Sequence, residues 1–468
     1  MILDNYQDFK QDVYPVTIFG SGPAGISVAL ELEKQNIKSV IIEAGPKMYD
    51  FTSQTYYKSH IEGDILYPDM TRTRLRHLGG TSGHWGGMSK SFTKNDYRNW
   101  GFNFDEFNNY TEKTCKILDI ENSFPESKLD SNFNQIKFQW SKVRFNEKYF
   151  DHIQKSKNIL LILNTQLSHF AGSNKKINYA LCINKSKKIK ITSNKFILCC
   201  GGIENSRILL WSKENNKQLF NSKLPIGNYW MTHYWILGGV SIIKEKALKK
   251  FMGSSYMEYD GPLHISYNDN LTKNNKLQVS CWLTVEEDKK FYKEIIKDIL
   301  CIAPKFGKKI ANMVFNKSLK CGNIFMHIEE KPIFENSINL SNKEKDPNNI
   351  PITKIIYKSS MDAKKSAREF LRKLGKLFQL NDLGRLAMFD ELDKLKQFKN
   401  LGNHHHMGGT RMGIDLNDSV VDTDLKVHEI DNLYISGSSI FRTSTYKNPT
   451  FQIVQFSLRL ADKIKSML

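Results

Sequence analysis

The sequence lacks long hydrophobic runs and contains few cysteines. No window among its 468 residues approaches the roughly 18 consecutive apolar residues of a membrane-spanning helix, so we expect no transmembrane segment. Residues 1–14 contain three aspartates and no apolar stretch, which is not the pattern of a secretory signal. The seven cysteines, an odd number without regular spacing, are typical of reduced thiols. Together these absences predict a cytoplasmic protein.

Acidic residues are fewer than basic ones, 49 against 68, which gives a formal net charge of +19. Such an excess can attract an anionic partner, for example nucleic acid, a membrane surface or a phosphorylated substrate. A general abundance of lysine, asparagine and isoleucine is the simpler interpretation. No nucleic-acid-binding module is recognisable, so we expect no nucleic-acid partner. An anionic substrate stays an open alternative.

The segment after residue 15 has the pattern of a dinucleotide-binding βαβ unit. An apolar strand, Val16–Phe19, runs into a G-x-G-x-x-G turn. A helix is expected over about Pro23–Gln35, and a second strand, Ser39–Ile42, ends at Glu43. Because strand, turn, helix and acid fall in register, the unit predicts a bound dinucleotide.

Each glycine of this turn has a physical role. Gly20 permits the tight turn, Gly22 lets the backbone approach a pyrophosphate, and Gly25 lets the helix pack closely on the strand. The N-terminus of the helix offers N–H groups and a positive dipole to the phosphates. Glu43 lies 18 residues beyond Gly25 (43 minus 25), close to the spacing of an acid that hydrogen-bonds a ribose.

Two further glycine corners and a C-terminal block follow. Leu78–Gly87 is too rich in glycine for the interior of a helix or strand, and such a run lets a backbone lie against a ligand. Phe196–Gly201 joins an apolar strand to a second corner, so we expect the chain to return there to the first sheet. The C-terminal block begins with three adjacent histidines in Asn403–Gly413 and continues through Gly437–Thr450.

The middle of the chain has a different pattern. Short strand-like segments, such as Gln278–Val285, Asn323–Ile328 and Ile352–Tyr357, predict a lobe with an antiparallel sheet. A helix with one apolar face is expected over Ala363–Phe378, and another is expected earlier in the chain over Phe104–Leu118. A second helix, Phe291–Val314, combines an apolar stripe with many lysines. It either lies on anionic lipid or, as we favour, packs its apolar stripe on the core.

In this order, the blocks resemble the glucose-methanol-choline (GMC) family of FAD-dependent alcohol oxidoreductases, and the C-terminal block is most similar to the sugar and polyol branch. The resemblance covers residues 1–45, both glycine corners, Pro225–His233 and the chain from Asn403 onward. It implies an α/β fold, α+β overall, with two domains. These are a discontinuous Rossmann-like FAD-binding domain and a substrate-binding domain with a mainly antiparallel sheet and flanking helices. The implied bounds are residues 1–100, 157–225 and 400–468 for the first domain, and 101–156 and 226–399 for the second.

The resemblance assigns the chemistry to the C-terminal block. His405 corresponds to the family's catalytic histidine, and Asn448, 43 residues later (448 minus 405), corresponds to its partner. A histidine suits the removal of a hydroxyl proton because its unperturbed pKa lies near the working pH. The amide of Asn448 does not titrate but can donate to a substrate oxygen and accept from a neighbour. Flavin N5 would accept the hydride.

The resemblance also implies which residues bind FAD. They lie in the glycine corners and the C-terminal block: Gly20, Gly22, Pro23, Ala24, Gly25, Glu43, Gly80, Ser82, His84, Gly86, Gly201, Gly437, Ser438, Asn448, Pro449 and Thr450. His84 leaves two alternatives, because some relatives attach FAD covalently through a histidine at this position, whereas a histidine can also only pack beside the flavin. FAD mass that stays on the denatured protein would decide between them.

The adjacent histidines His404, His405 and His406 are also candidate metal ligands. Adjacent side chains of an extended segment point to opposite faces, so the three cannot easily share one ion. No carboxylate or cysteine lies beside them at metal-site spacing. We therefore expect no metal.

The resulting prediction is FAD-dependent oxidation of a CH–OH group of a sugar, polyol or sugar-derived unit, with His405 as the base. The electron acceptor stays open among oxygen, a quinone and a redox protein, as do the oxidised carbon and the oligomeric state. One alternative is a non-redox, lyase-type enzyme on the same scaffold, since a fold does not fix a reaction. The other is a membrane-associated flavoprotein dehydrogenase with a different alcohol substrate, which only Phe291–Val314 supports. Peripheral membrane contact is therefore the less favoured interpretation.

Overall fold

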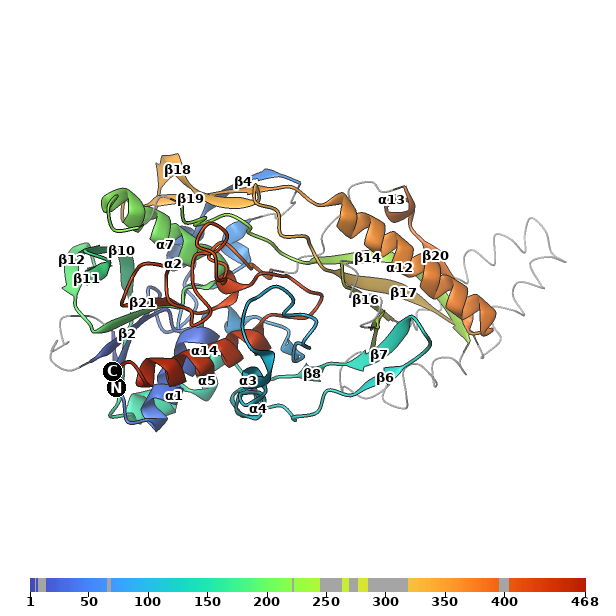
Figure 1. Cartoon of the computed structure of the whole chain (residues 1–468), viewed down its shortest axis with the longest axis horizontal. Coiled ribbons are helices and arrows are strands. Elements are labelled where there is room, and N and C mark those ends of the chain that lie inside the picture. The colour runs from blue at the N-terminus through green and yellow to red at the C-terminus, as the bar shows by residue number, and fades with distance from the viewer. Residues whose placement is uncertain are drawn as a thin grey trace.

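The computed structural model describes residues 1–4, 6, 14–64, 69–220, 223–244, 263–268, 277–284, 319–394 and 404–468. The predicted basic helix over Phe291–Val314 lies outside the described residues. Figure 1 shows two lobes along the long axis, one around a parallel sheet and the other around an antiparallel sheet backed by a long helix.

The first lobe is built on a six-stranded parallel sheet. Its strand order is β1-β9-β3-β2-β13-β21. Their bounds are Ile2–Leu3, Ile159–Ile162, Ser39–Ile42, Val16–Phe19, Lys195–Leu198 and Leu433–Ile435. The inner strands are mostly apolar and, except for Lys195 at the start of β13, buried, as expected for a parallel sheet covered on both faces. Here β13 pairs with β2, so the chain returns to the first sheet as predicted.

Three helices start at this sheet. Helix α1 (Pro23–Lys34) follows β2, α7 (Gly201–Asn215) follows β13, and α14 (Thr450–Lys465) ends the chain. The helices α1 and α14 pack side by side under the sheet (Figure 1). A small antiparallel sheet packs on α7 and consists of β10 (Thr165–Ser173), β11 (Lys176–Asn184) and β12 (Lys187–Ile191).

The second lobe is a seven-stranded antiparallel sheet with the order β20-β14-β17-β16-β15-β7-β6. The bounds are Gly384–Met388, Tyr234–Lys244, Leu319–Ile328, Val279–Leu283, Leu263–Tyr267, Phe133–Lys137 and Glu126–Lys128. Helix α12 (Met361–Leu380) covers one face (Figure 1). Its residues Phe370, Leu371 and Leu374 are buried in a core with every second side chain of the strands. This spacing follows because successive side chains of a strand point to opposite faces of the sheet.

The remaining elements connect the two lobes. Strand β4 (Ser59–Gly63) pairs with β19 (Pro351–Tyr357), which forms a hairpin with β18 (Ser337–Lys345). Short strands β5 and β8 pair with each other. The other bounds are β5 Met88–Ser89, β8 Gln139–Trp140, α2 Phe51–Gln54, α3 Phe104–Asn108, α4 Thr111–Leu118, α5 Phe145–Lys148, α6 Phe150–Lys155 and α13 Asp390–Asp393.

Two sequence expectations differ in detail from the structure. The helix expected around residues 104–118 is two helices, because Asn109 and Tyr110 interrupt it between α3 and α4. The domain division stays a prediction, but its segment 101–156 packs in two places. The helices α3 and α4 bury Phe107 and Ile117 in the core of the first lobe, whereas β6 and β7 belong to the second sheet.

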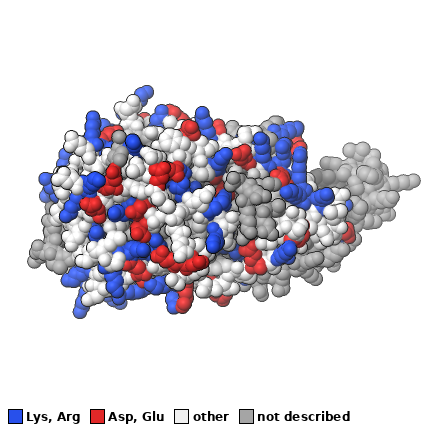
Figure 2. All heavy atoms as spheres, in the orientation of Figure 1, with Lys and Arg blue, Asp and Glu red and all other residues white. Residues whose placement is uncertain are grey.

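Charged side chains of both signs are dispersed over the face shown in Figure 2, with a group of basic ones over α12. This group comprises Lys365, Arg368, Arg372, Lys373 and Lys376. Within the described ranges, no helix combines the length and apolar character needed to cross a bilayer. The cytoplasmic location stays a prediction.

Candidate functional site

A cavity of about 340 Å³ in the first lobe is lined by the turn after β2, by both glycine corners and by the C-terminal block. The turn after β2, the corner Gly80–Gly87, the corner at Gly201 and the block His404–His406 contribute to its wall, together with Gly437 and Asn448–Thr450. Of the residues predicted to bind the cofactor, Gly25 is the one outside the lining. A Cβ atom at Gly25 would lie 1.9 Å from the Gly20 carbonyl oxygen, so this glycine allows close packing of α1 on the turn.

The cavity wall fits a dinucleotide phosphate. A Cβ atom at Gly22 or Gly201 would meet no atom within 4 Å, so both glycines border open space. The helices α1, α7 and α14 all begin at this wall, with Gly22, Cys200 and Pro449 as their N-cap residues. No side chain caps any of the three N-termini. Their N–H groups and dipoles favour an anionic ligand.

Glu43 lies in the cavity wall, but the turn holds its carboxylate. Oε2 accepts hydrogen bonds from Ser21 N at 2.9 Å and Ser21 Oγ at 2.6 Å, and Oε1 accepts from Gly45 N at 2.8 Å. The acid therefore braces the glycine turn in the structure. Its contact with a ribose stays a prediction.

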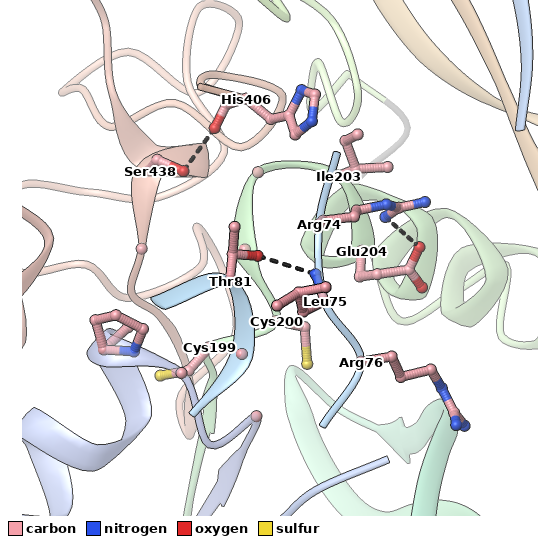
Figure 3. Close-up of a pocket in the computed structure, with 18 of the residues that line it drawn as sticks. Arg74, Leu75, Arg76, Thr81, Cys199, Cys200, Ile203, Glu204, His406 and Ser438 are labelled. Carbon is pink, nitrogen blue, oxygen red and sulfur yellow. Dashed lines mark hydrogen bonds and ion pairs between the residues drawn. The ribbon is translucent and has the colours of Figure 1, made fainter. Parts of the chain in front are cut away.

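A buried charge network supports the cavity, and no pattern in the sequence indicated it. Arg74 pairs with Glu204 (Figure 3), and its Nη1 lies 2.7 Å from Glu204 Oε1. Glu204 Oε2 lies 3.1 Å from Arg207 Nη1. Arg207 Nη2 pairs in turn with Asp346 Oδ2 at 2.7 Å. Burial alone would raise the pKa of Glu204, but Arg207 and Arg74 lower it. Glu204 follows the predicted corner directly, whereas nothing in the sequence around Arg74 indicated a role.

His405 makes the central contact of the site. Its Nδ1 lies 2.8 Å from Nε2 of His233, the residue before β14. Nδ1 of His233 faces two carbonyl oxygens, Thr445 O at 2.9 Å and Ser444 O at 3.3 Å. Carbonyls only accept hydrogen bonds, so the proton of His233 is on Nδ1 and its Nε2 accepts from His405. His405 therefore carries its proton on Nδ1, and its Nε2 is left with a free lone pair.

Electrostatics keep these imidazoles neutral. Burial lowers the pKa of His233 to about 4, against a smaller opposite effect of the two carbonyls. Burial also lowers the pKa of His405 well below its ordinary value, and the neighbouring His233, His406 and His404 lower it further. At neutral pH His405 is thus a neutral imidazole whose Nε2 can act as a base.

Asn448 lies in the same wall as His405. Its Oδ1 is buried and accepts no hydrogen bond from any described residue, which leaves it available to a ligand. The segment is anchored one residue earlier, where the buried Lys447 ammonium pairs with the buried Asp96 carboxylate. Burial alone would lower the pKa of Lys447, but Asp96 raises it. Asp96 also accepts from Gln278 Nε2 at 2.7 Å and Thr93 N at 2.5 Å.

The other histidines of the site have separate places. His406 Nε2 lies 3.0 Å from Thr73 Oγ1, and the His406 carbonyl accepts from Ser438 Oγ at 2.6 Å (Figure 3). His84 lies in the cavity wall, where burial and then His404 lower its pKa to about 4. Both alternatives for His84 stay open. In the described parts of the chain, no group of three or more His, Cys, Asp or Glu has the arrangement of a metal site. The expectation of no metal stays a prediction.

Comparison with known proteins connects these features to a family. The GMC oxidoreductase family model matches residues 332–457. The chain is similar to the fructose dehydrogenase large subunit of Gluconobacter japonicus, with 24% identity over 59% of this chain and 48% of that protein. It is also similar to the pyranose 2-oxidase of Tricholoma matsutake, with 39% identity over 14% of this chain and 11% of that protein. The chain thus spans less than half the length of both relatives.

The fold is also similar to a solved structure. The crystal structure of pyridoxine 4-oxidase from Mesorbium loti superposes with a TM-score of 0.61 at 13% identity, covering 97% of this chain and 99% of that chain. A likeness at this identity concerns the fold, and it confirms the predicted fold class. The segment 332–457, which contains His405 and Asn448, thus matches the GMC oxidoreductase family, and the fold of nearly the whole chain is similar to that of a solved oxidase.

Proposed function

We propose that this chain binds FAD and oxidises a CH–OH group of a sugar, polyol or sugar-derived unit. The observation that carries the proposal is the hydrogen bond from His405 to His233, which leaves a neutral base in the wall of the cavity. The similarity to a fructose dehydrogenase subunit and to a pyranose 2-oxidase supports the sugar class.

The residues of the cavity suit FAD. The open space at Gly22 and Gly201 and the three uncapped helix N-termini would hold the pyrophosphate. Glu43 would accept from the ribose, and Asn448–Thr450 would lie at the flavin end together with His84. When bound, FAD supplies the acceptor for the hydride of the alcohol carbon.

The chain's own groups move the proton and hold the alcohol. His405 Nε2 accepts the hydroxyl proton while the carbon loses its hydride, so that a carbonyl forms. Asn448 orients the hydroxyl oxygen through its amide, which does not titrate. His233 holds the imidazole of His405 in the tautomer that leaves Nε2 free, and it acts through His405 alone.

The test is anaerobic reduction of the purified flavoprotein with a panel of alcohols. We expect D-glucose, D-fructose or a related sugar or polyol to bleach the flavin absorbance. Simple aliphatic alcohols serve as the comparison class. Formation of a product without any flavin bleaching would contradict the proposal and would favour lyase-type chemistry.

His233→Leu is expected to slow flavin reduction about 10- to 100-fold, because it removes the acceptor for His405 Nδ1–H, a loss of roughly 1–3 kcal/mol. His233→Gln retains an amide oxygen to accept and an N–H to donate, so it should keep most of the rate. Stopped-flow absorbance of the flavin measures both variants.

The pH profile separates positioning from a merely structural role. In the unmodified protein the rate should stay level through neutral pH and fall only toward about pH 4, where His233 gains a proton on Nε2. In His233→Leu the acid limb should move to higher pH, since His233 no longer lowers the pKa of His405. An unchanged limb in that variant would show that His233 supports only the fold.

A further inference from the structure

One face of the seven-stranded sheet carries aromatic rings and imidazoles instead of aliphatic side chains. This face, here named the recognition face, consists of Trp235 on β14, Phe325 and His327 on β17, Trp282 on β16 and His264 on β15. The opposite face of the same strands packs on α12 through residues such as Ile236, Met326 and Cys281. Because successive side chains of a strand point to opposite faces, one face of this sheet packs on α12 and the other carries aromatic rings and imidazoles.

The recognition face begins directly at the catalytic base. His327 stacks on His233, with ring centroids 5.4 Å apart and an interplanar angle of 20°. His233 is the histidine whose Nε2 lies 2.8 Å from His405 Nδ1. Trp235 follows His233 by two residues and lies on the same side of β14. A substrate whose hydroxyl is held at His405 would thus have this face beside it.

The aromatic rings form one continuous apolar surface. The ring centroids of Trp282 and Phe325 are 5.2 Å apart, and those of Trp235 and Trp282 are 6.2 Å apart. All three side chains are only half-buried. Aromatic rings that keep apolar area open beside a few polar groups are typical of small-molecule sites.

Each imidazole of this face has one nitrogen that no described residue hydrogen-bonds. His264 is fully buried and His327 is 2% exposed, yet His264 Nε2 and His327 Nδ1 have no hydrogen-bond partner in the described part of the chain. Buried polar atoms of this kind cost free energy unless a ligand or water satisfies them. Burial lowers the pKa of His264 to about 3 and that of His327 well below its ordinary value. Both rings are neutral and can each donate and accept.

We propose that the recognition face binds the ring of an uncharged sugar, with C–H groups against Trp235, Trp282 and Phe325 and hydroxyl groups on His264 Nε2 and His327 Nδ1. This inference rests on the proposed function, because it names the substrate class of the same site. A sugar ring combines apolar C–H faces with hydroxyls at its edge, which matches this alternation of rings and neutral imidazoles. An anionic group would find no charge on the two imidazoles to compensate its desolvation.

The first test uses the flavin-loaded protein and the best sugar of the panel, together with its monodeoxy analogues. At least one deoxy analogue should lose tenfold or more in kcat/KM, because the imidazole that its missing hydroxyl contacted is left unpaired. In His327→Leu and His264→Leu, KM should rise tenfold or more while kcat changes less, and the deoxy penalty at the contacted hydroxyl should vanish.

Two further variants keep this test decisive. Met326→Leu lies on the opposite face of β17, so it controls for disturbance of the strand and should leave KM unchanged. If His327→Leu does not fold, His327→Gln retains neutral hydrogen-bonding atoms and should raise KM less than threefold. Variants of His264 and His327 with the original KM and the original deoxy penalty would overturn the inference.

Charged sugars test the inference that the bound sugar is uncharged. D-gluconate and D-glucose 6-phosphate should react at least tenfold less efficiently than the uncharged sugar. Lys90, which is buried and lowers the pKa of His264 through its charge, is the described cation to examine here. A preference for the charged sugars that Lys90→Met abolishes would overturn the assignment of an uncharged substrate. If no sugar or polyol bleaches the flavin at all, it is the proposed function that fails.

Discussion

His405→Ala is expected to keep FAD bound and to slow anaerobic flavin reduction by roughly 10²- to 10⁴-fold, the range for loss of a general base. The variant removes the Nε2 lone pair that receives the hydroxyl proton, while the glycine corners and helix N-termini of the cavity are untouched. Stopped-flow absorbance of the flavin measures the rate, and the visible spectrum of the purified variant reports cofactor retention.

Two comparisons make this result specific. His152→Ala removes an exposed histidine that pairs with Glu33 outside the cavity, and it should leave flavin reduction unchanged. Added imidazole should restore part of the rate in His405→Ala, and more so as the pH rises, because neutral imidazole is the base. A His405→Ala variant that reduces its flavin at the original rate would refute the role of His405.

Asp96→Asn is expected to destabilise the folded protein by about 3–5 kcal/mol, the cost of breaking a buried ion pair from one side. The substitution leaves the Lys447 ammonium, 2% exposed, without its buried carboxylate. Because Asn448 follows Lys447 directly, flavin should also be released at lower urea concentration. Urea unfolding followed by tryptophan and flavin fluorescence measures both effects.

A matched double variant separates the contribution of the ion pair to stability from the contribution of the space that its side chains fill. Asp96→Leu combined with Lys447→Met removes both charges, and it should regain part of the stability lost in Asp96→Asn, since apolar replacements of a buried pair are often neutral. The recovery is partial because the N–H groups of Thr93 and Gln278 lose their acceptor. If Asp96→Asn unfolds at the same urea concentration as the unmodified protein, Lys447 is not held by this pair.

The elements of the first lobe were predictable because their signals are local. The strands Val16–Phe19 and Ser39–Ile42 have the bounds that the apolar runs indicated, since a central parallel strand is apolar along its whole length. Glycines mark the corners because a side chain there would collide with backbone, as Gly25 would with Gly20. The interruption at Asn109 and Tyr110 was missed, because there the Tyr110 hydroxyl donates to Asp462, a contact 352 residues away.

The partners of the site residues were not predictable. The sequence singled out His405 by resemblance to a family, but its hydrogen bond to His233 joins residues 172 positions apart. The Lys447–Asp96 pair spans 351 positions, and the Arg74–Glu204 pair spans 130. No periodicity or spacing in one chain carries such information. The two lobes must first pack before these side chains meet.

The order of glycine corners, apolar strands and C-terminal histidines was thus enough to predict the fold class, and through the family resemblance it also predicts FAD as the cofactor and His405 as the base. Which nitrogen of His405 is free, what anchors Asn448 and which wall faces the base depended on how the two lobes pack. The physical reason is the distance along the chain between the residues that interact. Backbone conformation and burial of a strand follow from neighbouring residues, whereas the proton position on an imidazole follows from the carbonyls behind its partner, and these come from the far end of the chain.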